Sequence, residues 1–451
     1  MEKLETKGRR EIVSLFDAGT FVEMGAYIRR RGEADVYDAV LCGYGAIEGK
    51  LTFAFVQDSD RKAGALDEIG AAKIEKLYEQ AVRNGAPVIG VFDSAGAVVY
   101  DGATALSAYG RVMKCVSDAS GIIPQIAYVS GVCGGMAAVI ASMFDFAVTA
   151  EGQSALYVNA PNVVGGKADA ASARADGLSA ITAADGAAAV LAVRELAALL
   201  PSHNRDVADI EPTDAPDRPA AIEGLSGLSL IRAVADNARA VALYEGYADE
   251  MVTALALLGG RLCGVIATDA AVSDGQITAA AARKAARLVS FCDSFSIPVV
   301  TLVDSTGVET VNDPEQATAF AKLANAYATA SCAKISVVTG KAYGAAFTML
   351  GSRALGADLA LALPTSVISV MSPERAVAFA WNDKITHTES RAEVEAKWME
   401  TYATPTSAAE NGDIDDIVPA EELRARLCAA LYMLSEKADL YPDRKHGVLP
   451  L

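Results

Sequence analysis

The sequence predicts an α/β protein of two tandem domains, each with a mainly parallel sheet flanked by helices. Short apolar segments of strand-like pattern alternate with longer segments whose apolar residues recur three and four apart. One stretch also occurs twice, at a constant separation that takes Asp38 to Asp249 and Gly49 to Gly260. The length of 451 residues agrees, because a single core rarely serves a chain longer than about 300 residues.

The internal repeat covers most of each half of the chain. The same separation pairs Gly64 with Gly275 and ends where "DSAG" at 93–96 meets "DSTG" at 304–307. A register without gaps, with glycine and proline at matching places, indicates a duplicated unit rather than shared composition. The two domains are therefore expected to share one fold, related by a pseudo-twofold internal repeat.

Within the first half the expected elements alternate as in a parallel sheet. Each expected strand is short and apolar, and each expected helix has one apolar face. The expected strands are 51–58, 87–93 and 123–130, and the expected helices are 67–85, 105–120 and 136–143. The loops that follow the carboxyl ends of the strands then meet at one edge, where folds of this class place their sites.

A change in composition marks the expected domain boundary. In the segment 201–224, proline, aspartate and glutamate replace the apolar periodicity, as is typical of a linker. The predicted domains are therefore 1–224 and 225–451.

The charge balance argues against two classes of partner. The chain carries 39 basic and 57 acidic side chains, a formal net charge of -18. Such a surface repels nucleic acid and anionic membranes. The apolar run 126–144 is long enough for a membrane span, but its glycines favour a buried strand and helix, so no membrane insertion is expected. The basic runs 29–31 and 61–62 are candidate contacts for a phosphorylated ligand.

Cysteine and histidine usage indicates the compartment and argues against a metal site. Seven cysteines stand singly, with no CxxC pair and an odd count, which is typical of reduced thiols in a cytoplasmic protein. The three histidines lie far apart in sequence, so no metal centre is expected. The first residues are charged and amphipathic, unlike a signal peptide.

Two glycine turns point to chemistry done by the backbone. "VSGVCGGMAAVI" at 129–140 and "VTGKAYGAAF" at 338–347 each join a strand to a helix, and the first contains no side chain that donates a proton efficiently. The first N–H groups of such a helix can bind an anion, either a phosphate or an oxygen that becomes negative during a reaction. The glycines can also simply allow close helix packing. Neither the P-loop nor the dinucleotide-binding fingerprint is present.

The residues around these turns resemble a known family. The matching segments are "LFDAGTFVEM" at 15–24, "NGAPVIGVFDSAG" at 84–96, "IPQIAYVSGVCGG" at 123–135, "FCDSFSIPVVTLVD" at 291–304, "KAYGAAF" at 341–347 and "GADLALALPTSVISVMSPERAV" at 356–377. Together they resemble the carboxyltransferase (beta) subunits of biotin-dependent acyl-CoA carboxylases and decarboxylases, of the propionyl-CoA carboxylase, acetyl-CoA carboxylase and methylmalonyl-CoA decarboxylase type. These are crotonase-superfamily proteins, so the resemblance implies two tandem crotonase-like domains.

The resemblance also implies a reaction and its partners. A carboxylate would move between carboxybiotin and the alpha carbon of an acyl-CoA thioester, with the first domain on the CoA side and the second on the biotin side. Biotin itself would take the alpha proton. No biotinyl-lysine motif occurs in the sequence, so a separate biotin carboxyl carrier protein or biotin carboxylase subunit is expected to bring the biotin. A homo-oligomer, a dimer or a trimer of dimers, is expected.

Matching the family's motifs assigns the site residues to backbone amides. Gly135 and Met136 would form the acyl oxyanion hole, and Ala345 and Ala346 the biotin hole. The substrate-binding loops implied by the resemblance contain Gly64, Ala65, Ala95, Gly96 and Gly134 in the first half and Gly275, Gly307 and Gly344 in the second.

Several positions depart from the family's usual residues. Ala95 and Met136 replace glycines, Val98 replaces an arginine, Thr348 stands where an aspartate is common near the acyl pocket, and 308–322 lacks paired glycines. An active carboxyltransferase is the favoured interpretation. Two alternatives are a degenerate, non-catalytic paralogue that scaffolds or regulates a carboxylase complex, and a crotonase-type CoA enzyme that does not use biotin.

Overall fold

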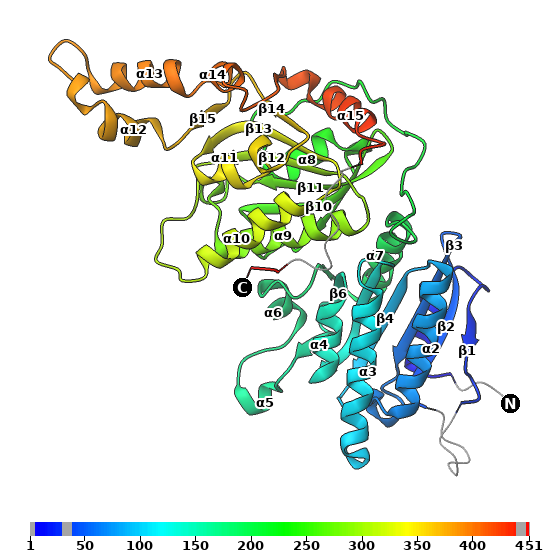
Figure 1. Cartoon of the computed structure of the whole chain (residues 1–451). Coiled ribbons are helices and arrows are strands. Elements are labelled where there is room, and N and C mark those ends of the chain that lie inside the picture. The colour runs from blue at the N-terminus through cyan, green and yellow to red at the C-terminus, as the bar shows by residue number, and fades with distance from the viewer. Residues whose placement is uncertain (1–4, 29–37, 439–447, 451) are drawn as a thin grey trace. The chain divides into compact units, whose positions relative to one another are not determined.

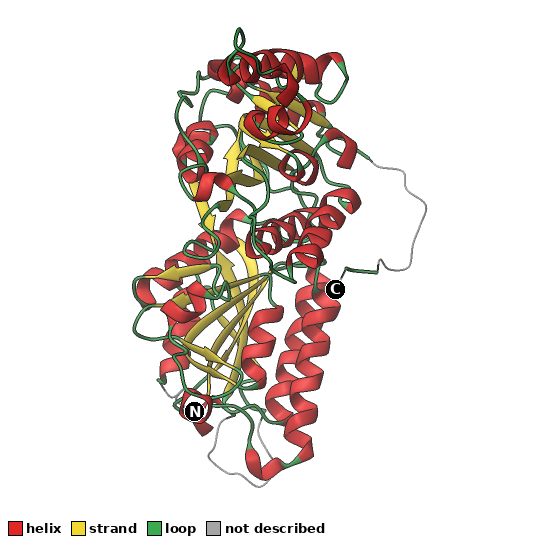
Figure 2. Ribbon diagram, turned by 90° about the vertical axis from the view of Figure 1, so that its left-hand side faces the viewer, coloured by secondary structure: helices red, strands yellow, loops and turns green. Residues whose placement is uncertain are grey.

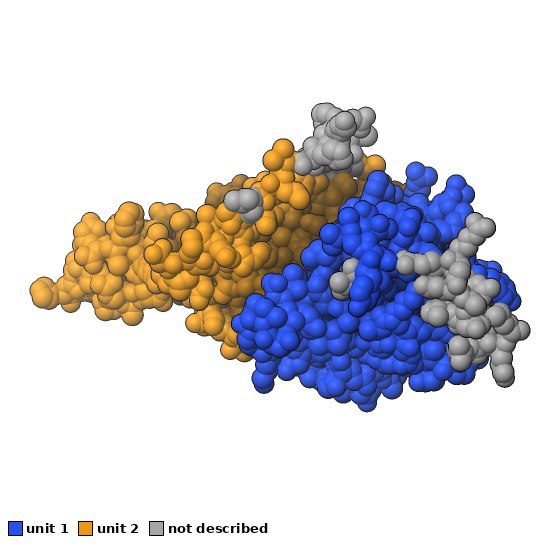
Figure 3. Space-filling model, turned by 90° about the horizontal axis from the view of Figure 1, so that it is seen from below, with its two compact units in different colours: residues 1–208 blue, residues 209–451 orange. Residues whose placement is uncertain are grey.

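The computed structural model of the chain describes residues 5–28, 38–438 and 448–450. The basic run 29–31 lies outside these residues. The chain divides into two compact units, Met1–Ala208 and Asp209–Leu451 (Figure 3). The division falls inside the proline-rich segment 201–224 but earlier than residue 224. Part of that segment packs on unit 2, where the Ile210 N–H donates to the Gly260 carbonyl at 2.8 Å.

Unit 1 contains one sheet with helices on its faces (Figures 1 and 2). Its strands are β1 (Val22–Met24), β2 (Val40–Ile47), β3 (Lys50–Gln57), β4 (Val88–Ser94), β5 (Gln125–Gly134), β6 (Phe146–Ala150), β7 (Ala155–Tyr157) and β8 (Ile181–Ala183). Its helices are α1 (Lys7–Leu15), α2 (Glu68–Asn84), α3 (Ala103–Ala119), α4 (Met136–Met143), α5 (Pro161–Val164), α6 (Ala170–Ala175) and α7 (Gly186–Leu199).

Unit 2 repeats this order and adds a longer helical excursion after its seventh strand. Its strands are β9 (Ala240–Leu243), β10 (Met251–Leu258), β11 (Arg261–Thr268), β12 (Val299–Ser305), β13 (Lys334–Tyr343), β14 (Leu359–Ala362), β15 (Val367–Ser369) and β16 (Asp416–Ile417). Its helices are α8 (Gly227–Val234), α9 (Ala279–Ser294), α10 (Gln316–Thr329), α11 (Ala345–Met349), α12 (Pro373–Ala380), α13 (Arg391–Tyr402), α14 (Pro405–Glu410) and α15 (Leu423–Met433).

The two sheets have the same topology. The strand order is β1-β2-β3-β4-β5-β6-β8 in unit 1 and β9-β10-β11-β12-β13-β14-β16 in unit 2, with β7 on β5 and β15 on β13. The first three strands of each sheet pair antiparallel, and the strands that follow pair parallel. Every residue of β4 is buried, as expected of a central strand covered on both faces. The predicted α/β repeat is therefore confirmed.

Local capping explains why the predicted helices begin and end where they do. The Asp67 carboxylate accepts the N–H groups of Ile69 and Gly70 at the start of α2, and Gly85 ends the helix with φ of 60°. The expected strand 123–130 is too short, however. β5 continues to Gly134, because a bulge near Gly131 bends the strand without ending it.

In each unit an arginine on the last helix pairs with an aspartate that also binds a hairpin turn. We call this pair the clasp; it is Arg194 with Asp17 in unit 1 and Arg424 with Asp236 in unit 2. In unit 2 the Asp236 carboxylate accepts the N–H groups of Gly259 and Gly260, at 2.8 and 2.7 Å, in the β10–β11 turn. Arg424 of α15 is fully buried and donates to Asp236 at 2.7 Å and to the Val234 carbonyl at 2.5 Å. This arrangement ties the unit's last helix to its first hairpin.

Unit 1 has the same clasp in a more exposed form. Asp17 accepts the N–H groups of Glu48 and Gly49 in the β2–β3 turn, at 3.2 and 3.0 Å. Arg194 of α7 donates to Asp17 at 2.8 Å and to the Leu15 carbonyl at 2.7 Å. The Arg194 hydrogen bond, with those of the turn, lowers the pKa of Asp17. The repeat thus extends to a side-chain pair that links distant parts of each unit.

Arg424→Met is expected to destabilise unit 2 by about 3 kcal/mol, because it leaves a buried carboxylate without its cation. Both tryptophans, Trp381 and Trp398, lie in unit 2, so tryptophan fluorescence during urea unfolding reports on that unit. Arg194→Met, the matched change in unit 1, should leave the fluorescence transition in place. Equal shifts of the fluorescence midpoint in the two variants would contradict the assignment.

Candidate functional site

The residues predicted for the first site meet at one edge of the unit 1 sheet. The short 3-10 helix η1 (Lys62–Gly64) follows β3, the segment 94–98 follows β4, and the turn into α4 follows β5. These three strands are parallel neighbours, so their carboxyl ends share an edge. The Ala95 N–H donates to the Ala63 carbonyl at 3.0 Å, and the Leu66 N–H donates to the Gly96 carbonyl at 3.2 Å.

Unit 2 makes the same joint between its equivalent loops. The 3-10 helix η4 (Ser273–Gly275) follows β11 as η1 follows β3. The Thr306 N–H donates to the Asp274 carbonyl at 3.2 Å, and the Ile277 N–H donates to the Gly307 carbonyl at 2.9 Å. The predicted loop residues therefore come together within each half.

Both 3-10 loops require glycine, because the backbone of the neighbouring strand passes too close for a side chain. A Cβ at Gly64 would lie 1.9 Å from the Asp93 carbonyl oxygen, and a Cβ at Gly275 would lie 2.3 Å from that of Asp304. In both loops the two residues before the glycine also have positive φ, which is rare outside glycine and stores strain. In unit 1 these residues include Ala63, with φ of 51°.

A buried aspartate shapes the end of β5. Pairing with β4 slips from Phe92 opposite Val129 to Ser94 opposite Cys133, so β5 contains two extra residues. A Cβ at Gly131 would lie 2.1 Å from the Asp93 carboxylate, which fills the space of the missing side chain. The same carboxylate accepts the Val132 N–H at 3.1 Å.

Beyond the bulge, β5 takes a new partner and leads directly into α4. Val132–Gly134 pair with β7, and the Gly135 N–H donates to the Tyr157 carbonyl at 2.9 Å. Gly135 has φ of 63° and serves as the N-cap, so the helix begins at Met136. This conformation favours glycine, which explains the residue type at the turn.

The end of β13 is built in the same way. Pairing with β12 slips from Val303 opposite Val338 to Ser305 opposite Ala342. A Cβ at Gly340 would collide with the Asp304 carboxylate, which accepts the Lys341 N–H at 2.8 Å. The Gly344 N–H donates to the Ser369 carbonyl of β15 at 2.9 Å, and α11 begins at the next residue.

Most of the predicted amides are already hydrogen-bonded within the chain. The N–H groups of Gly64, Ala65, Ala95, Gly96, Gly135, Gly275, Gly307 and Gly344 all donate to neighbouring carbonyl or hydroxyl oxygens. Because Gly135 has one N–H and it bonds to Tyr157, that amide cannot also face a ligand. The next amides along the chain are those of Met136 and Ala137, at the start of α4.

The remaining amides form equivalent sets in the two units. Met136 and Ala137 begin α4, and Ala345 and Ala346 begin α11, where a helix leaves its first N–H groups without an intrahelical acceptor. These four N–H groups have no partner among residues 5–28, 38–438 and 448–450. The repeat aligns Gly135 with Gly344. Since Ala345 and Ala346 follow Gly344, the same alignment points to Met136 and Ala137 after Gly135.

The 3-10 loops hold a further amide in each unit. Ala63 and Asp274 are exposed residues at equivalent positions, and no described residue accepts a hydrogen bond from their N–H groups. They lie at the same sheet edge as the helix starts. Neither residue was singled out from the sequence, because only their backbone conformation distinguishes them.

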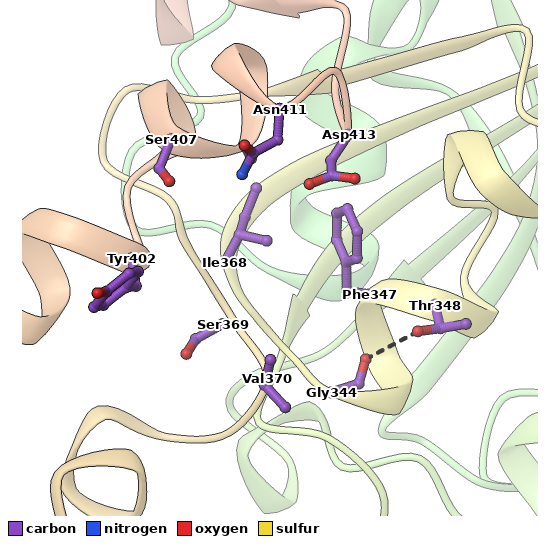
Figure 4. A pocket seen from close by; sticks show the side chains of 11 residues that line it. Gly344, Phe347, Thr348, Ile368, Ser369, Val370, Tyr402, Ser407, Asn411 and Asp413 are labelled. Atoms are coloured by element: carbon purple, nitrogen blue, oxygen red, sulfur yellow. Dashed lines mark hydrogen bonds between the residues drawn. The ribbon is translucent and has the colours of Figure 1, made fainter. Parts of the chain in front are cut away.

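A cavity of about 320 Å³ lies beside the start of α11 (Figure 4). Its lining includes Gly344, Phe347 and Thr348 on one side and Tyr402, Asn411 and Asp413 on the other, but no basic side chain. The Thr348 hydroxyl turns back to donate to the Gly344 carbonyl at 3.4 Å. The cavity therefore suits an uncharged group with hydrogen-bond donors better than a phosphate.

The side chains available as nucleophiles or metal ligands are few in the described part of the chain. Burial raises the pKa of every cysteine, to about 12 for Cys42 and Cys332 and about 11 for Cys115, so the thiols stay protonated near neutral pH. No three histidine, cysteine, aspartate or glutamate side chains of these residues gather as a metal site requires. None of the described helices is long and apolar enough to cross a membrane.

Gly64→Ala is expected to cost clearly more stability than Gly152→Ala. The two glycines have similar φ, 68° and 70°, but a Cβ at Gly152 meets nothing within 4 Å. The conformation alone should cost about 1–2 kcal/mol in both variants. The collision with the Asp93 carbonyl adds to this cost only at Gly64. Urea unfolding followed by far-ultraviolet circular dichroism measures both values, and equal losses would contradict the close approach.

Known proteins resemble this chain along its whole length. Residues 7–449 match the carboxyl transferase domain. The methylmalonyl-CoA decarboxylase subunit alpha of Veillonella parvula is 32% identical, with 100% of this chain and 95% of that protein covered. The carboxyltransferase subunit of propionyl-CoA carboxylase from Haloferax mediterranei is also 32% identical, over 100% of this chain and 94% of that protein.

A solved structure has the same fold. The crystal structure of transcarboxylase 12S, a hexamer with hydrolyzed methylmalonyl-coenzyme A bound, matches with a TM-score of 0.93 and 31% identity. The match covers 98% of this chain and 92% of that chain. The expected pair of crotonase-like domains is therefore confirmed. With its domain matched over residues 7–449, the chain belongs to the carboxyl transferase family.

Proposed function

We propose that the chain moves a carboxyl group between biotin and the alpha carbon of an acyl-CoA thioester, using one set of backbone amides in each unit. The observation that carries this proposal is the repetition of the set: each unit presents two helix-start amides and one loop amide at the same sheet edge. A transfer between two carbonyl-type groups needs two such sets, one for each oxygen that gains negative charge.

Family membership and named relatives support the reaction class. The relatives include a methylmalonyl-CoA decarboxylase subunit and the carboxyltransferase subunit of a propionyl-CoA carboxylase. The chain is accordingly an acyl-CoA carboxyltransferase. The finer proposal concerns the sites, with the CoA side in unit 1 and the biotin side in unit 2.

In unit 1 the proposed donors are the amides of Met136, Ala137 and Ala63. They would face the thioester oxygen, which becomes negative when the alpha carbon loses or gains the carboxyl group. A preorganised donor of this kind is typically worth about 3 kcal/mol in the transition state. Methionine at position 136 keeps its backbone N–H, as any residue except proline does. Its side chain is 40% exposed.

In unit 2 the proposed donors are the amides of Ala345, Ala346 and Asp274. The adjoining cavity fits a ureido ring, because it offers oxygen acceptors at Asn411 and Asp413 and no competing cation. Its volume lies at the lower end of the range of small-molecule sites, about 300–1,000 Å³. Biotin, when bound there on its carrier, would donate or accept the carboxyl group that is transferred.

The described side chains fit a backbone mechanism. His203 packs against Gly85 and accepts the Arg205 N–H at 3.1 Å, so it is engaged in a turn. His387 is exposed in a loop before α13. The cysteines are protonated near neutral pH. The chain's own contribution is therefore to orient the thioester and to stabilise charge.

The partners follow from the reaction. We propose a separate biotin carrier and association of several copies of this chain, as in transcarboxylase 12S, which is a hexamer. The seven cysteines are free, in keeping with the reducing cytoplasm that the sequence predicts.

Met136→Pro is expected to slow turnover of methylmalonyl-CoA in the presence of free biotin about a hundredfold, because it removes one oxyanion donor. Proline suits the first position of a helix, so α4 should remain intact. Met136→Ala keeps the N–H and serves as the matched control. Initial rates of propionyl-CoA formation measure the effect, and equal rates in the two variants would reject Met136 as a donor.

Titration of the protein with several CoA thioesters separates the proposal from its alternatives. Affinity for a thioester together with turnover that requires biotin supports the proposal. A folded protein that binds no thioester but joins a carboxylase complex would be the non-catalytic paralogue. Thioester turnover that does not depend on biotin would indicate a crotonase-type enzyme.

A further inference from the structure

We propose that Asp93 and Asp304 are positioning residues that hold the two amide sets in place from behind the sheet edge. The inference rests on the proposed function, since it assigns a role to residues that support the proposed donors. Neither residue is placed against substrate. Each acts through the bulge of the neighbouring strand and through the 3-10 loop.

Each aspartate touches both segments that carry the donors. The Asp93 carboxylate fills the space beside Gly131 and accepts the Val132 N–H, so it fixes the bulge that leads to α4. The Asp93 carbonyl oxygen packs against Gly64, next to the Ala63 amide. One residue therefore sets the distance between the loop donor and the helix donors.

Loss of the bulge would move the helix start. Each residue of a strand advances the chain by about 3.3 Å, and β5 contains two extra residues at the bulge. Without a carboxylate to hold the Val132 N–H, the strand can straighten and carry the α4 amides away from η1. The same reasoning applies to Asp304, Gly340 and Lys341 in β13.

The two aspartates differ in the hydrogen-bond donors that surround their carboxylates. In unit 1, Lys7 and Ser59 each donate to Asp93 at 2.5 Å. Burial opposes the charge of Lys7, but the hydrogen bond to Asp93 and the nearby carboxylates raise the pKa of Lys7 overall, so it remains a cation. The second carboxylate oxygen of Asp93 thus receives two donors besides the bulge.

Unit 2 lacks both of these donors. Gly8 and Gly227 pack against the equivalent residues Asp58 and Asp269, so Ser226 stands where Lys7 stands in unit 1. Ser226 donates to Asp269 instead, at 2.6 Å. The repeat also places Ala270 opposite Ser59. Within the described part of the chain, the Asp304 carboxylate accepts only the Lys341 N–H.

This difference predicts that replacement by asparagine is tolerated at position 304 and harmful at position 93. At position 304, asparagine keeps one oxygen for the Lys341 N–H, and its amide group meets no other donor. At position 93, the asparagine amide group must face either the Val132 N–H or the Lys7 ammonium, and neither of these can accept a hydrogen bond. Two donors then oppose each other in a buried place, which is costly.

The test compares Asp93→Asn and Asp304→Asn with the corresponding alanine variants in the full chain. The assay is formation of propionyl-CoA from methylmalonyl-CoA with free biotin. We expect both alanine variants and Asp93→Asn to lower kcat about tenfold to a hundredfold, with KM for the thioester nearly unchanged. Asp304→Asn should restore kcat to within about threefold of the wild type, since the single backbone hydrogen bond persists.

A second measurement keeps the test independent of turnover. Hydrogen–deuterium exchange of the peptides that span 129–137 and 338–346 should speed up in the alanine variants and in Asp93→Asn, but not in Asp304→Asn. The double variant Lys7→Met with Asp93→Asn should recover part of the lost kcat, because one opposing donor is gone. Misfolding is excluded by circular dichroism.

The outcomes distinguish this inference from the proposed function. A wild-type protein without activity on any CoA thioester would overturn the proposed function. The exchange measurements would then still test whether the two aspartates hold the bulges. An active wild type with alanine variants of unchanged kcat and unchanged exchange would overturn the inference. Equal responses of Asp93→Asn and Asp304→Asn would overturn the assigned role of Lys7.

Discussion

An aspartate carboxylate set into a bent strand is the contact that shapes the sheet edge in both units. Asp93 replaces the side chain that Gly131 lacks and binds the next backbone N–H, and Asp304 does the same beside Gly340. The strand can then leave one neighbour for another and deliver a helix start to the sheet edge. A straight strand would bury these amides in the sheet's regular ladder, where they have carbonyl partners.

The sequence predicted the fold well, because its signals are local or repeated. The helices expected at 67–85 and 136–143 agree with α2 and α4, since capping residues and apolar spacing determine their bounds. The strand expected to stop at Gly131 did not stop, since the bulge depends on a carboxylate from another strand. Such a contact between distant residues leaves no trace in local periodicity.

The sequence predicted which turn begins α4, but not which of its amides lack a partner. The motif pointed to Gly135, but whether its N–H is available depends on a carbonyl of β7 that only the folded chain brings close. The amides of Ala63 and Asp274 could not be predicted as candidates, because alanine and aspartate carry no sign of a left-handed backbone. Departures such as Met136 and Ala95 change side chains, whereas the proposed donors are N–H groups that any residue except proline provides.

The arginine–aspartate clasp has an evolutionary consequence. Each unit has its own arginine–aspartate clasp and its own sheet of the same topology. A chain of half the length, with one sheet and one such pair, is therefore a plausible folding unit in its own right, and duplication of that unit accounts for the repeat in the sequence.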